Sequence, residues 1–251
     1  MLIAPGIAAL ELTAVIMGKP SAIYPALLWD RDEVVLIDTG YPGQLDPIVA
    51  ELKNYDLPFE GVSRILLSHQ DIDHIGSLPD LVRQFSHSVS VMSGSFEKPY
   101  IEGKLRLLRM TPEAIDQAVS SLPPNVSEQW RQAFRHTLEN PPSSPVHGIL
   151  EDGQELPYGG GIVVIATPGH TPGHLSFYHR ASKTLIAADA LTVNAAGELC
   201  GPDPITTLDP NLARRSLAKL AEFDIETVVC YHGGPYRGDA NTRLRELASI
   251  R

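Results

Sequence analysis

Residues 68–76 read Ser-His-Gln-Asp-Ile-Asp-His-Ile-Gly and place four side chains that can bind a metal ion within six positions. The four are His69, Asp71, Asp73 and His74. Carboxylates crowded together repel one another, and their burial costs free energy unless a cation compensates it. The alternative is a solvated acidic turn, which the crowding of like charges disfavours. The segment therefore predicts a metal site.

The elements on either side of this segment would hold such ligands in place. Residues 63–67 have the pattern of a strand, and residues 76–82 have the pattern of a helix start. A loop at a strand-to-helix junction is supported by two rigid elements, which is where metal ligands can be positioned accurately.

Two histidines follow a second predicted strand at residues 161–166. Pro172 and Gly173 disfavour a helix that would put His170 and His174 on one face, so the two histidines should differ in role. His170 comes directly after the turn Thr167-Pro168-Gly169 and is the better ligand. His174 heads the next predicted strand, and we expect it to orient a neighbouring residue by hydrogen bonding.

Two more candidate ligands also follow predicted strands. Asp189 comes after residues 184–188, and His232 comes after residues 226–231. Taken alone, such an aspartate is more often a cap or turn residue, and such a histidine is usually structural. The recurrence of a histidine or aspartate at successive strand ends indicates one shared site.

The rest of the chain alternates between predicted strands and helices, which favours an α/β architecture of sheets covered by helices. Further strands are expected at residues 11–17, 22–29, 33–37, 88–92 and 175–179, and helices at 45–55, 211–223 and 241–250. The strands at 22–29 and 33–37 should form a hairpin. We expect a single domain over residues 1–251.

Residues 96–145 are polar, helix-prone and interrupted by Pro112, Pro123, Pro124, Pro141, Pro142 and Pro145. We interpret them as a helical cap inserted into the domain, with a mere surface excursion as the alternative. Lys98 or Tyr100 could contact the substrate, as a carboxylate anchor or an oxyanion donor. The alternative for Tyr100 is that it only seats the cap on the core. His87, His136, His147 and His179 lack ligand neighbours and are expected at the surface.

Composition limits the possible partners. The 251 residues are 43% hydrophobic with a formal net charge of −10, as expected for a globular protein that does not bind nucleic acid. No apolar run is long enough to cross a membrane, and the first residues lack the features of a secretory signal. Only Cys200 and Cys230 are present, so we expect a cytoplasmic protein. The expected partner is a small-molecule substrate.

The block His69-x-Asp71-x-Asp73-His74, followed by His170, Asp189 and His232, resembles the metallo-β-lactamase fold hydrolases. Residues 36–40 (Leu-Ile-Asp-Thr-Gly) and the doublet at residues 167–174 match that family as well. The resemblance covers nearly the whole chain and implies a four-layer αββα sandwich with a dinuclear metal site at the sheet edges. Asp38 is implied as a supporting residue under the site.

The resemblance also assigns the ligands. One metal ion would be held by His69, Asp71 and His170, the other by Asp73, His74 and His232, with Asp189 bridging the two. The family usually has a histidine where this chain has Asp71. The expected cofactor is two divalent ions, with zinc first and manganese or iron as alternatives, because a carboxylate is a harder donor than an imidazole. A first site that is only partly filled is the other interpretation of Asp71.

The expected chemistry is hydrolysis of an ester, lactone, thioester, β-lactam or phosphoester by a hydroxide bound to two metal ions. Asp73 would act catalytically by orienting the nucleophile and carrying a proton to the leaving group. The sequence has no Gly-x-Ser-x-Gly or Walker motif that would supply a different mechanism.

Two other functions remain open. Flavodiiron proteins share this fold and carry a carboxylate at the position of Asp71, which motivates a di-iron redox enzyme. They use glutamate there and normally carry a flavin domain, so the redox alternative requires a separate electron donor. The third possibility is a non-catalytic, metal-containing sensor.

Overall fold

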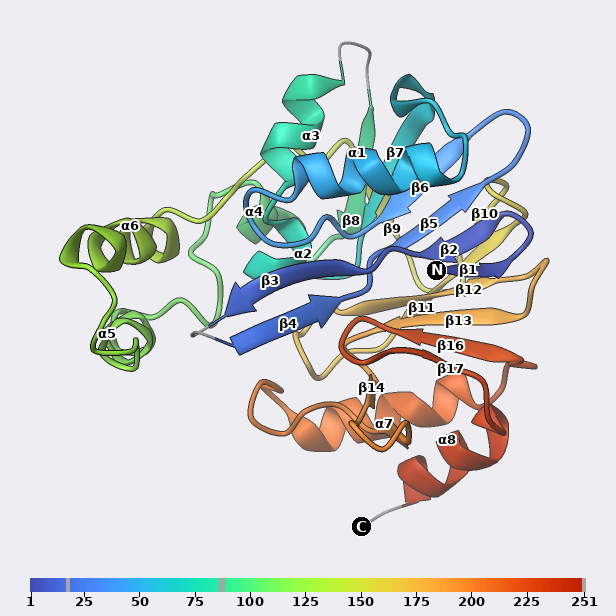
Figure 1. Ribbon diagram of the computed structural model, residues 1–251. Helices are drawn as coiled ribbons and strands as arrows, with labels where there is room; N and C mark the ends of the chain where they lie inside the picture. Colours follow the sequence, from blue (N-terminus) through green and yellow to red (C-terminus); the bar gives the residue numbers. More distant parts are fainter. Residues whose placement is uncertain (17–18, 86–88, 250–251) are drawn as a thin grey trace.

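The computed structural model describes residues 1–16, 19–85 and 89–249. Two β-sheets pack face to face, and helices cover the outer face of each (Figure 1). The fold is therefore the four-layer αββα sandwich that the sequence predicted. No helix in the described ranges has both the length and the apolar character required of a transmembrane span.

The first sheet has seven strands in the order β1-β2-β5-β6-β7-β8-β9. Its strands from β6 to β9 are mutually parallel. The bounds are β1 Leu2–Ala4, β2 Ile7–Ala9, β5 Ala26–Trp29, β6 Val34–Ile37, β7 Val62–Leu67, β8 Ser90–Gly94 and β9 Gly148–Leu150.

The second sheet has six strands in the order β10-β11-β12-β13-β16-β17. Its bounds are β10 Glu155–Leu156, β11 Ile162–Ala166, β12 Leu175–His179, β13 Thr184–Ala188, β16 Thr227–Cys230 and β17 Gly234–Tyr236. Two short ribbons accompany the sheets, formed by β3 Leu12–Ile16 with β4 Lys19–Ile23 and by β14 Thr192–Val193 with β15 Leu199–Cys200.

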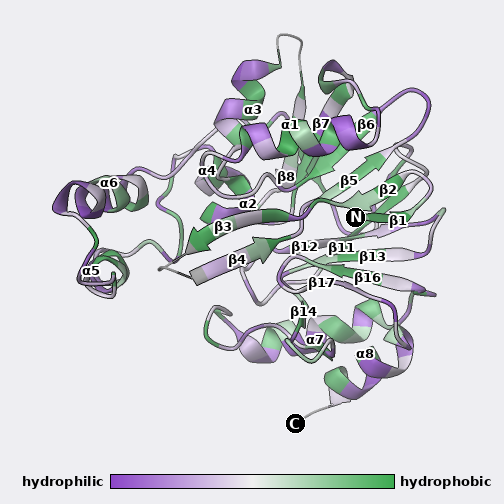
Figure 2. Ribbon diagram, in the orientation of Figure 1, coloured by the Kyte–Doolittle hydropathy of each residue, from purple (hydrophilic) through white to green (hydrophobic). Residues whose placement is uncertain are grey.

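Alternating strand side chains build the layers, because successive residues of a strand face opposite sides of the sheet. Val35 and Ile37 belong to the core between the two sheets, together with Phe177 of β12. Leu36 instead belongs to the cluster that the first sheet shares with the outer helices, together with Ile48 of the first helix. Hydrophobic residues accordingly fill the strands, while the outer surfaces of the helices carry the hydrophilic ones (Figure 2).

The helices that cover the sheets likewise bury one face each. Helices α1 and α3 share a hydrophobic cluster with the first sheet, and α7 and α8 share one with the second. The bounds are α1 Leu45–Asn54, η1 Phe59–Gly61, α2 Ile72–Ile75, α3 Leu78–Gln84, α4 Lys98–Ile101, α5 Pro112–Ser120, α6 Glu128–Glu139, α7 Pro210–Leu220 and α8 Ala240–Ser249.

The predicted hairpin of residues 22–29 with residues 33–37 is confirmed as β5 paired with β6. The prediction of one continuous strand over 22–29 was wrong, because Ile23 ends β4 and Ala26 begins β5. Tyr24 and Pro25 between them connect the β3–β4 ribbon to the first sheet, and Pro25, which has no amide hydrogen for a strand ladder, is the local signal of this break.

The inserted stretch contains α4, α5 and α6. Helices α5 and α6 pack on each other and lie beyond the β3–β4 ribbon, away from both sheets (Figure 1). Each begins at a hydroxyl cap: Thr111 accepts a hydrogen bond from the Ala114 amide, and Ser127 accepts one from the Trp130 amide.

Candidate metal centre

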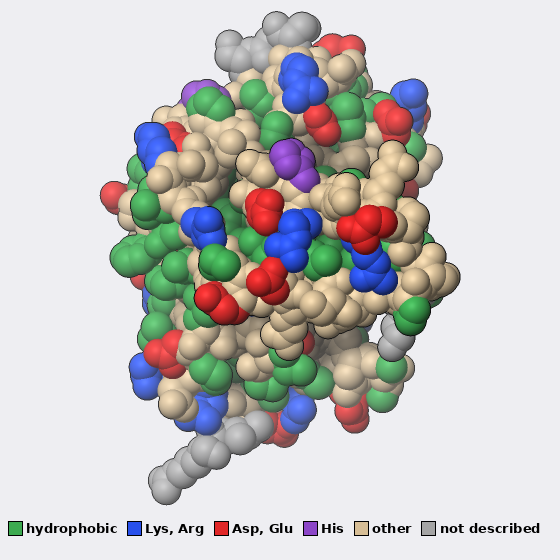
Figure 3. Space-filling model, turned by 90° about the vertical axis from the view of Figure 1, so that its left-hand side faces the viewer, with side chains coloured by type: hydrophobic (Ala, Val, Ile, Leu, Met, Phe, Trp, Pro, Cys, Tyr) green, Lys and Arg blue, Asp and Glu red, His purple; other side chains and the backbone are tan. Residues whose placement is uncertain are grey.

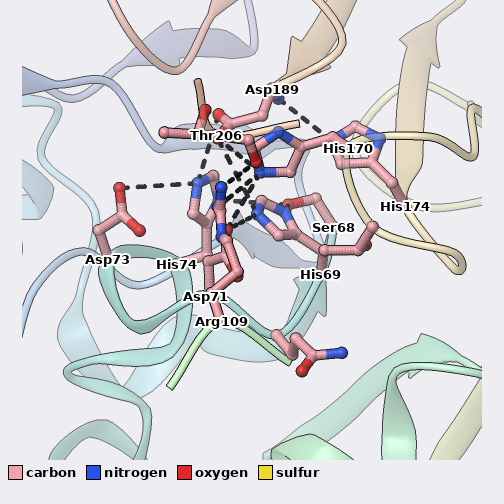
Figure 4. Close-up of polar contacts among 12 residues, drawn as sticks. Ser68, His69, Asp71, Asp73, His74, Arg109, His170, His174, Asp189 and Thr206 are labelled. Atoms are coloured by element: carbon pink, nitrogen blue, oxygen red, sulfur yellow. Dashed lines mark hydrogen bonds and ion pairs between the residues drawn. The ribbon is translucent and has the colours of Figure 1, made fainter. Parts of the chain in front are cut away.

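The candidate ligands follow strands that end at one edge of the two sheets. β6 and β7 are parallel in the first sheet, and β13 and β16 are parallel in the second. β11 also runs parallel to β13, because each pairs antiparallel with β12 between them. The loops after these strands therefore meet at one place (Figure 4).

Seven side chains gather there in two groups. In the first, ligand-type atoms of His69, Asp71, His170 and Asp189 all lie within 4.8 Å of one another. In the second, those of Asp73, His74 and His232 do the same. These are the residues that the sequence singled out, divided between two clusters as the resemblance implied.

Asp189 contacts both groups. Its carboxylate lies 3.3 Å from Nε2 of His170 in the first group. The same carboxylate lies 3.4 Å from Nε2 of His74 and 3.6 Å from Nε2 of His232 in the second. A single carboxylate placed between two histidine clusters can bridge two cations.

Several of the donor atoms lack a hydrogen-bond partner, although Nε2 of His170 and the Asp71 carboxylate contact Arg109. Within the described part of the chain, Nε2 of His69, Nε2 of His74 and Oδ1 of Asp189 are buried and make no hydrogen bond. Buried polar atoms are normally satisfied, so unpaired ones converging on one point require an explanation. A set of imidazole nitrogens and carboxylate oxygens fits divalent metal ions of the zinc, manganese or iron type.

Asp38 holds this arrangement from beneath. Its carboxylate accepts hydrogen bonds from the Ser68 amide at 2.8 Å and from the Ser68 hydroxyl at 2.7 Å. It also lies 2.8 Å from Nδ1 of His74, so that Nδ1–H can donate to it while Nε2 faces the site. Asp38 adopts a φ of +62°, a left-handed conformation that directs the chain from β6 across the sheet edge.

Both ring nitrogens of His174 have hydrogen-bond partners within the protein, so neither is free to bind a metal ion. Its Nδ1 lies 2.8 Å from the Thr167 hydroxyl, and its Nε2 accepts a hydrogen bond from the Asp189 amide at 3.1 Å. It therefore positions Asp189, in keeping with the orienting role expected from the sequence. Ala188, directly before Asp189, has a φ of +46°, which stores backbone strain at this point.

Gly169 allows the His170 loop to approach α7. A Cβ atom at this position would overlap the backbone of Ala213, and the φ of Gly169 is +137°. Any other residue here would push the loop, and with it His170, away from α7.

The histidines of the site differ in the direction in which their pKa values are shifted. Burial lowers the pKa of His170 to about 4 and lowers the pKa of His69 well below its usual value, so both imidazoles are neutral at pH 7. Burial has the same tendency at His232, but the carboxylates of Asp189 and Asp73 outweigh it and raise the pKa of His232 to about 10. Without a cation, the second group therefore holds a proton where a metal ion could bind.

Arg109 is a site residue that the sequence analysis missed. Its guanidinium contacts the Asp71 carboxylate and the Thr206 carbonyl, and it lies 2.9 Å from Nε2 of His170 (Figure 4). It comes from the inserted stretch, between α4 and α5, where its neighbours in sequence give no sign of chemistry. Its positive charge balances part of the negative charge that Asp71 adds to the first group.

Glu97 is the second residue that the sequence analysis missed. It is fully buried and accepts four hydrogen bonds: from the amide and side chain of Gln70, from the Thr171 hydroxyl and from the Gly173 amide, at 2.8–3.0 Å. Gln70 lies between His69 and Asp71 in the chain, and Thr171 follows His170. Glu97 therefore links, by hydrogen bonds, the loop that carries His69 and Asp71 to the loop that carries His170.

The predicted substrate contacts lie elsewhere. Lys98 donates a hydrogen bond to the Val146 carbonyl at 2.8 Å, and Tyr100 packs against the core of the first sheet. Neither lines the cavity of about 260 Å³ at the candidate ligands, whose walls include Tyr41, Asp73 and Arg109. Tyr100 thus takes the packing role that was its alternative.

The remaining histidines need one correction. His136 and His147 are exposed, as expected, while His87 lies outside the described residues. The prediction for His179 was wrong: it is buried, with Nε2 2.6 Å from the Gly159 carbonyl and Nδ1 2.7 Å from the Ser182 hydroxyl. The glycine turn at residues 159–161 folds back over it, a contact that the local sequence does not reveal.

Comparisons with known proteins agree with this geometry. The chain is 33% identical over 226 residues to the probable metallo-hydrolase YflN of Bacillus subtilis, covering 86% of this chain and 81% of that protein. It is 26% identical to the hydroxyacylglutathione hydrolase GloC of Haemophilus influenzae, over 68% of each chain.

Among solved structures, the metallo-β-lactamase family protein TTHA1429 of Thermus thermophilus superposes with a TM-score of 0.67 at 26% identity, over 99% of this chain and 80% of that one. The metallo-β-lactamase IND-7 shares the fold with a TM-score of 0.66 at 15% identity, over 100% of this chain and 96% of that one. The model of the metallo-beta-lactamase superfamily matches residues 19–232. The chain therefore belongs to the metallo-β-lactamase superfamily, and curated relatives such as YflN are named metallo-hydrolases.

Proposed function

We propose that this protein is a hydrolase that uses two divalent metal ions, with zinc expected first, to cleave an ester, lactone, thioester or phosphoester. The observation that carries the proposal is the pair of donor clusters joined by Asp189, with unpaired buried nitrogens facing the space between them. When bound, two divalent ions at such a site supply an activated water and polarise the oxygen of the scissile group.

The chain's own residues then have separable tasks. His69, Asp71 and His170 would hold one ion, and His74 and His232 would hold the other together with Asp73. Asp189 would bridge them. The residues of the first group are at least nine-tenths buried, whereas the His232 side chain is 37% exposed, so substrate would enter from the side of His232.

Asp73 would be the proton carrier. Its carboxylate lines the cavity and lies 3.3 Å from Nε2 of His232. Burial works against its ionised form, but His74 and His232 outweigh that effect and lower the pKa of Asp73, so its carboxylate is ionised at neutral pH. The Tyr231 hydroxyl donates to the Asp73 carbonyl at 2.5 Å and fixes the backbone there.

Arg109 would face the polar part of the substrate. It lines the same cavity as Asp73 and carries a positive charge at all relevant pH values. Relatives such as GloC are named for hydrolysis of an acylated glutathione, which places acyl substrates ahead of phosphoesters in this proposal.

The test is a hydrolysis screen of metal-reconstituted protein against acetyl esters, lactones, thioesters and phosphoesters. We expect turnover that a chelator removes, and we expect Asp189→Ala and His170→Ala to abolish it while lowering metal content in a folded protein. His136→Ala is the matched control, because His136 is exposed on α6 and remote from both donor groups. Full activity in the Asp189 or His170 variant would refute the site assignment.

A further inference from the structure

An apolar cavity of about 460 Å³ lies beside the candidate metal centre. The inserted helices form one wall, through Trp130, Phe134 and Leu138 of α6, and Val15 of the β3–β4 ribbon lies across from them. Its volume is in the range of small-molecule sites, which are typically concave and mostly apolar.

The two cavities share a wall. Tyr41 lines both the apolar cavity and the cavity at the donor groups. Ile72, which also lines the apolar cavity, stands in the chain between Asp71 and Asp73. Tyr41 therefore stands between the two cavities, so a molecule that reached from the metal centre to the apolar surface would have to pass this side chain.

The two cavities differ in the chemistry of their walls. The metal-side cavity is bounded by Asp73, Arg109 and Asp203, whereas no charged side chain lines the apolar one. A charged group placed against the apolar wall would lose hydration and gain no partner. The face of the molecule that carries α5 and α6 shows hydrophobic side chains next to charged ones (Figure 3).

The apolar wall is unusually open to water for such large side chains. Trp130 is 49% exposed and Val15 is 72% exposed, although Trp130 stacks on Phe134 with ring centroids 5.3 Å apart. Covering them with a ligand chain would remove this apolar surface from water, which is favourable in proportion to the area covered.

We infer that this cavity binds the unbranched aliphatic acyl chain of the substrate, while the polar leaving group faces Arg109. The inference rests on the proposed function and narrows it to acyl esters, acyl thioesters or acyl-bearing lactones. The chain would run from the carbonyl carbon at the metal centre, past Tyr41, to the surface between α6 and β3.

The first test reads binding without requiring turnover. The protein has two tryptophans, so Trp29→Phe leaves Trp130 as the sole tryptophan. Decanoate added to this metal-loaded variant should shift the Trp130 emission to shorter wavelength in a saturable way, whereas acetate should not. Ala133→Leu, which adds bulk to the cavity wall from an exposed helical position, should weaken the decanoate response at least tenfold.

The second test reads turnover against chain length. With p-nitrophenyl esters from butyryl to decanoyl, kcat/KM should rise about fourfold for each methylene that becomes buried. Ala133→Leu and Phe134→Ala should both flatten this dependence. Leu105→Ala is the control, because Leu105 lies in the same insertion, is 50% exposed and lines neither cavity.

The outcomes separate the two proposals. Decanoate binding without hydrolysis of any ester would keep the acyl site and refute the hydrolase. Hydrolysis of short esters with no chain-length dependence and no Trp130 response would keep the hydrolase and refute the acyl site. An emission that shifts with protein concentration alone would show that a second copy of the chain covers the cavity, which also overturns the inference.

Discussion

Glu97→Gln tests whether the four hydrogen bonds of the buried Glu97 carboxylate position the first group of candidate ligands. The amide retains one carbonyl oxygen, so two of the four hydrogen bonds at Glu97 lose their acceptor and their donors face an NH₂ group. Hydrogen bonds to a charged acceptor contribute about 1.5–3 kcal/mol each and are not additive. We expect the free energy of unfolding to fall by about 2–4 kcal/mol.

The same substitution should act selectively on metal binding. Glu97 holds Gln70 and Thr171, which flank His69, Asp71 and His170. Among the described residues, its carboxylate makes no hydrogen bond or ion pair with the second group. Loss of a residue that orients ligands typically costs 10–100-fold in metal affinity. We therefore expect one of two binding events in a zinc titration to weaken by that factor.

The measurements are urea unfolding of the metal-free protein and calorimetric titration with zinc. Glu102→Gln is the matched control, because Glu102 lies close by in the chain and its carboxylate bonds, within the described ranges, only to Lys98, Lys104 and Val146. Wild-type stability together with two unchanged binding events in Glu97→Gln would refute the reasoning.

Three further predictions follow from the site and the core. Asp71→His should shift metal preference toward zinc, since an imidazole replaces a hard oxygen donor; an unchanged metal profile would show that the donor at this position does not select the ion. Removal of metal with a chelator should lower the melting temperature, because Asp71, Asp73 and Asp189 then lack a compensating cation, and added zinc should restore it. Burial lowers the pKa of His179, so its imidazole stays neutral in the fold but is protonated in the unfolded chain below about pH 6.5. The stability advantage of wild type over His179→Gln should therefore be greatest above pH 7 and shrink toward pH 5, by up to about 1.4 kcal/mol per pH unit; a gap that does not change with pH would contradict this.

The sequence singled out side chains that lie together in the structure, because their signal is local. His69 to His74 lie in one loop, and His170, Asp189 and His232 each follow an apolar strand. The strands that end at one edge then bring these loops together, which is a property of the α/β topology.

The residues that were missed act through contacts far apart in sequence. Arg109 reaches His170 across 61 positions, and Glu97 reaches Gly173 across 76. Nothing in the local pattern distinguishes them from surface residues, because charged side chains are mostly exposed. The same limitation explains His179, which was expected at the surface and is enclosed by the Gly159 turn.

Elemental analysis of the freshly purified protein, before and after reconstitution, tests the central claim most directly. The two donor clusters joined by Asp189 predict about two equivalents of zinc or manganese per chain, falling in Asp189→Ala. Two equivalents of iron, with oxygen consumption when an electron donor is added, would favour the di-iron redox alternative instead. A chain that binds no metal even after reconstitution would contradict the account.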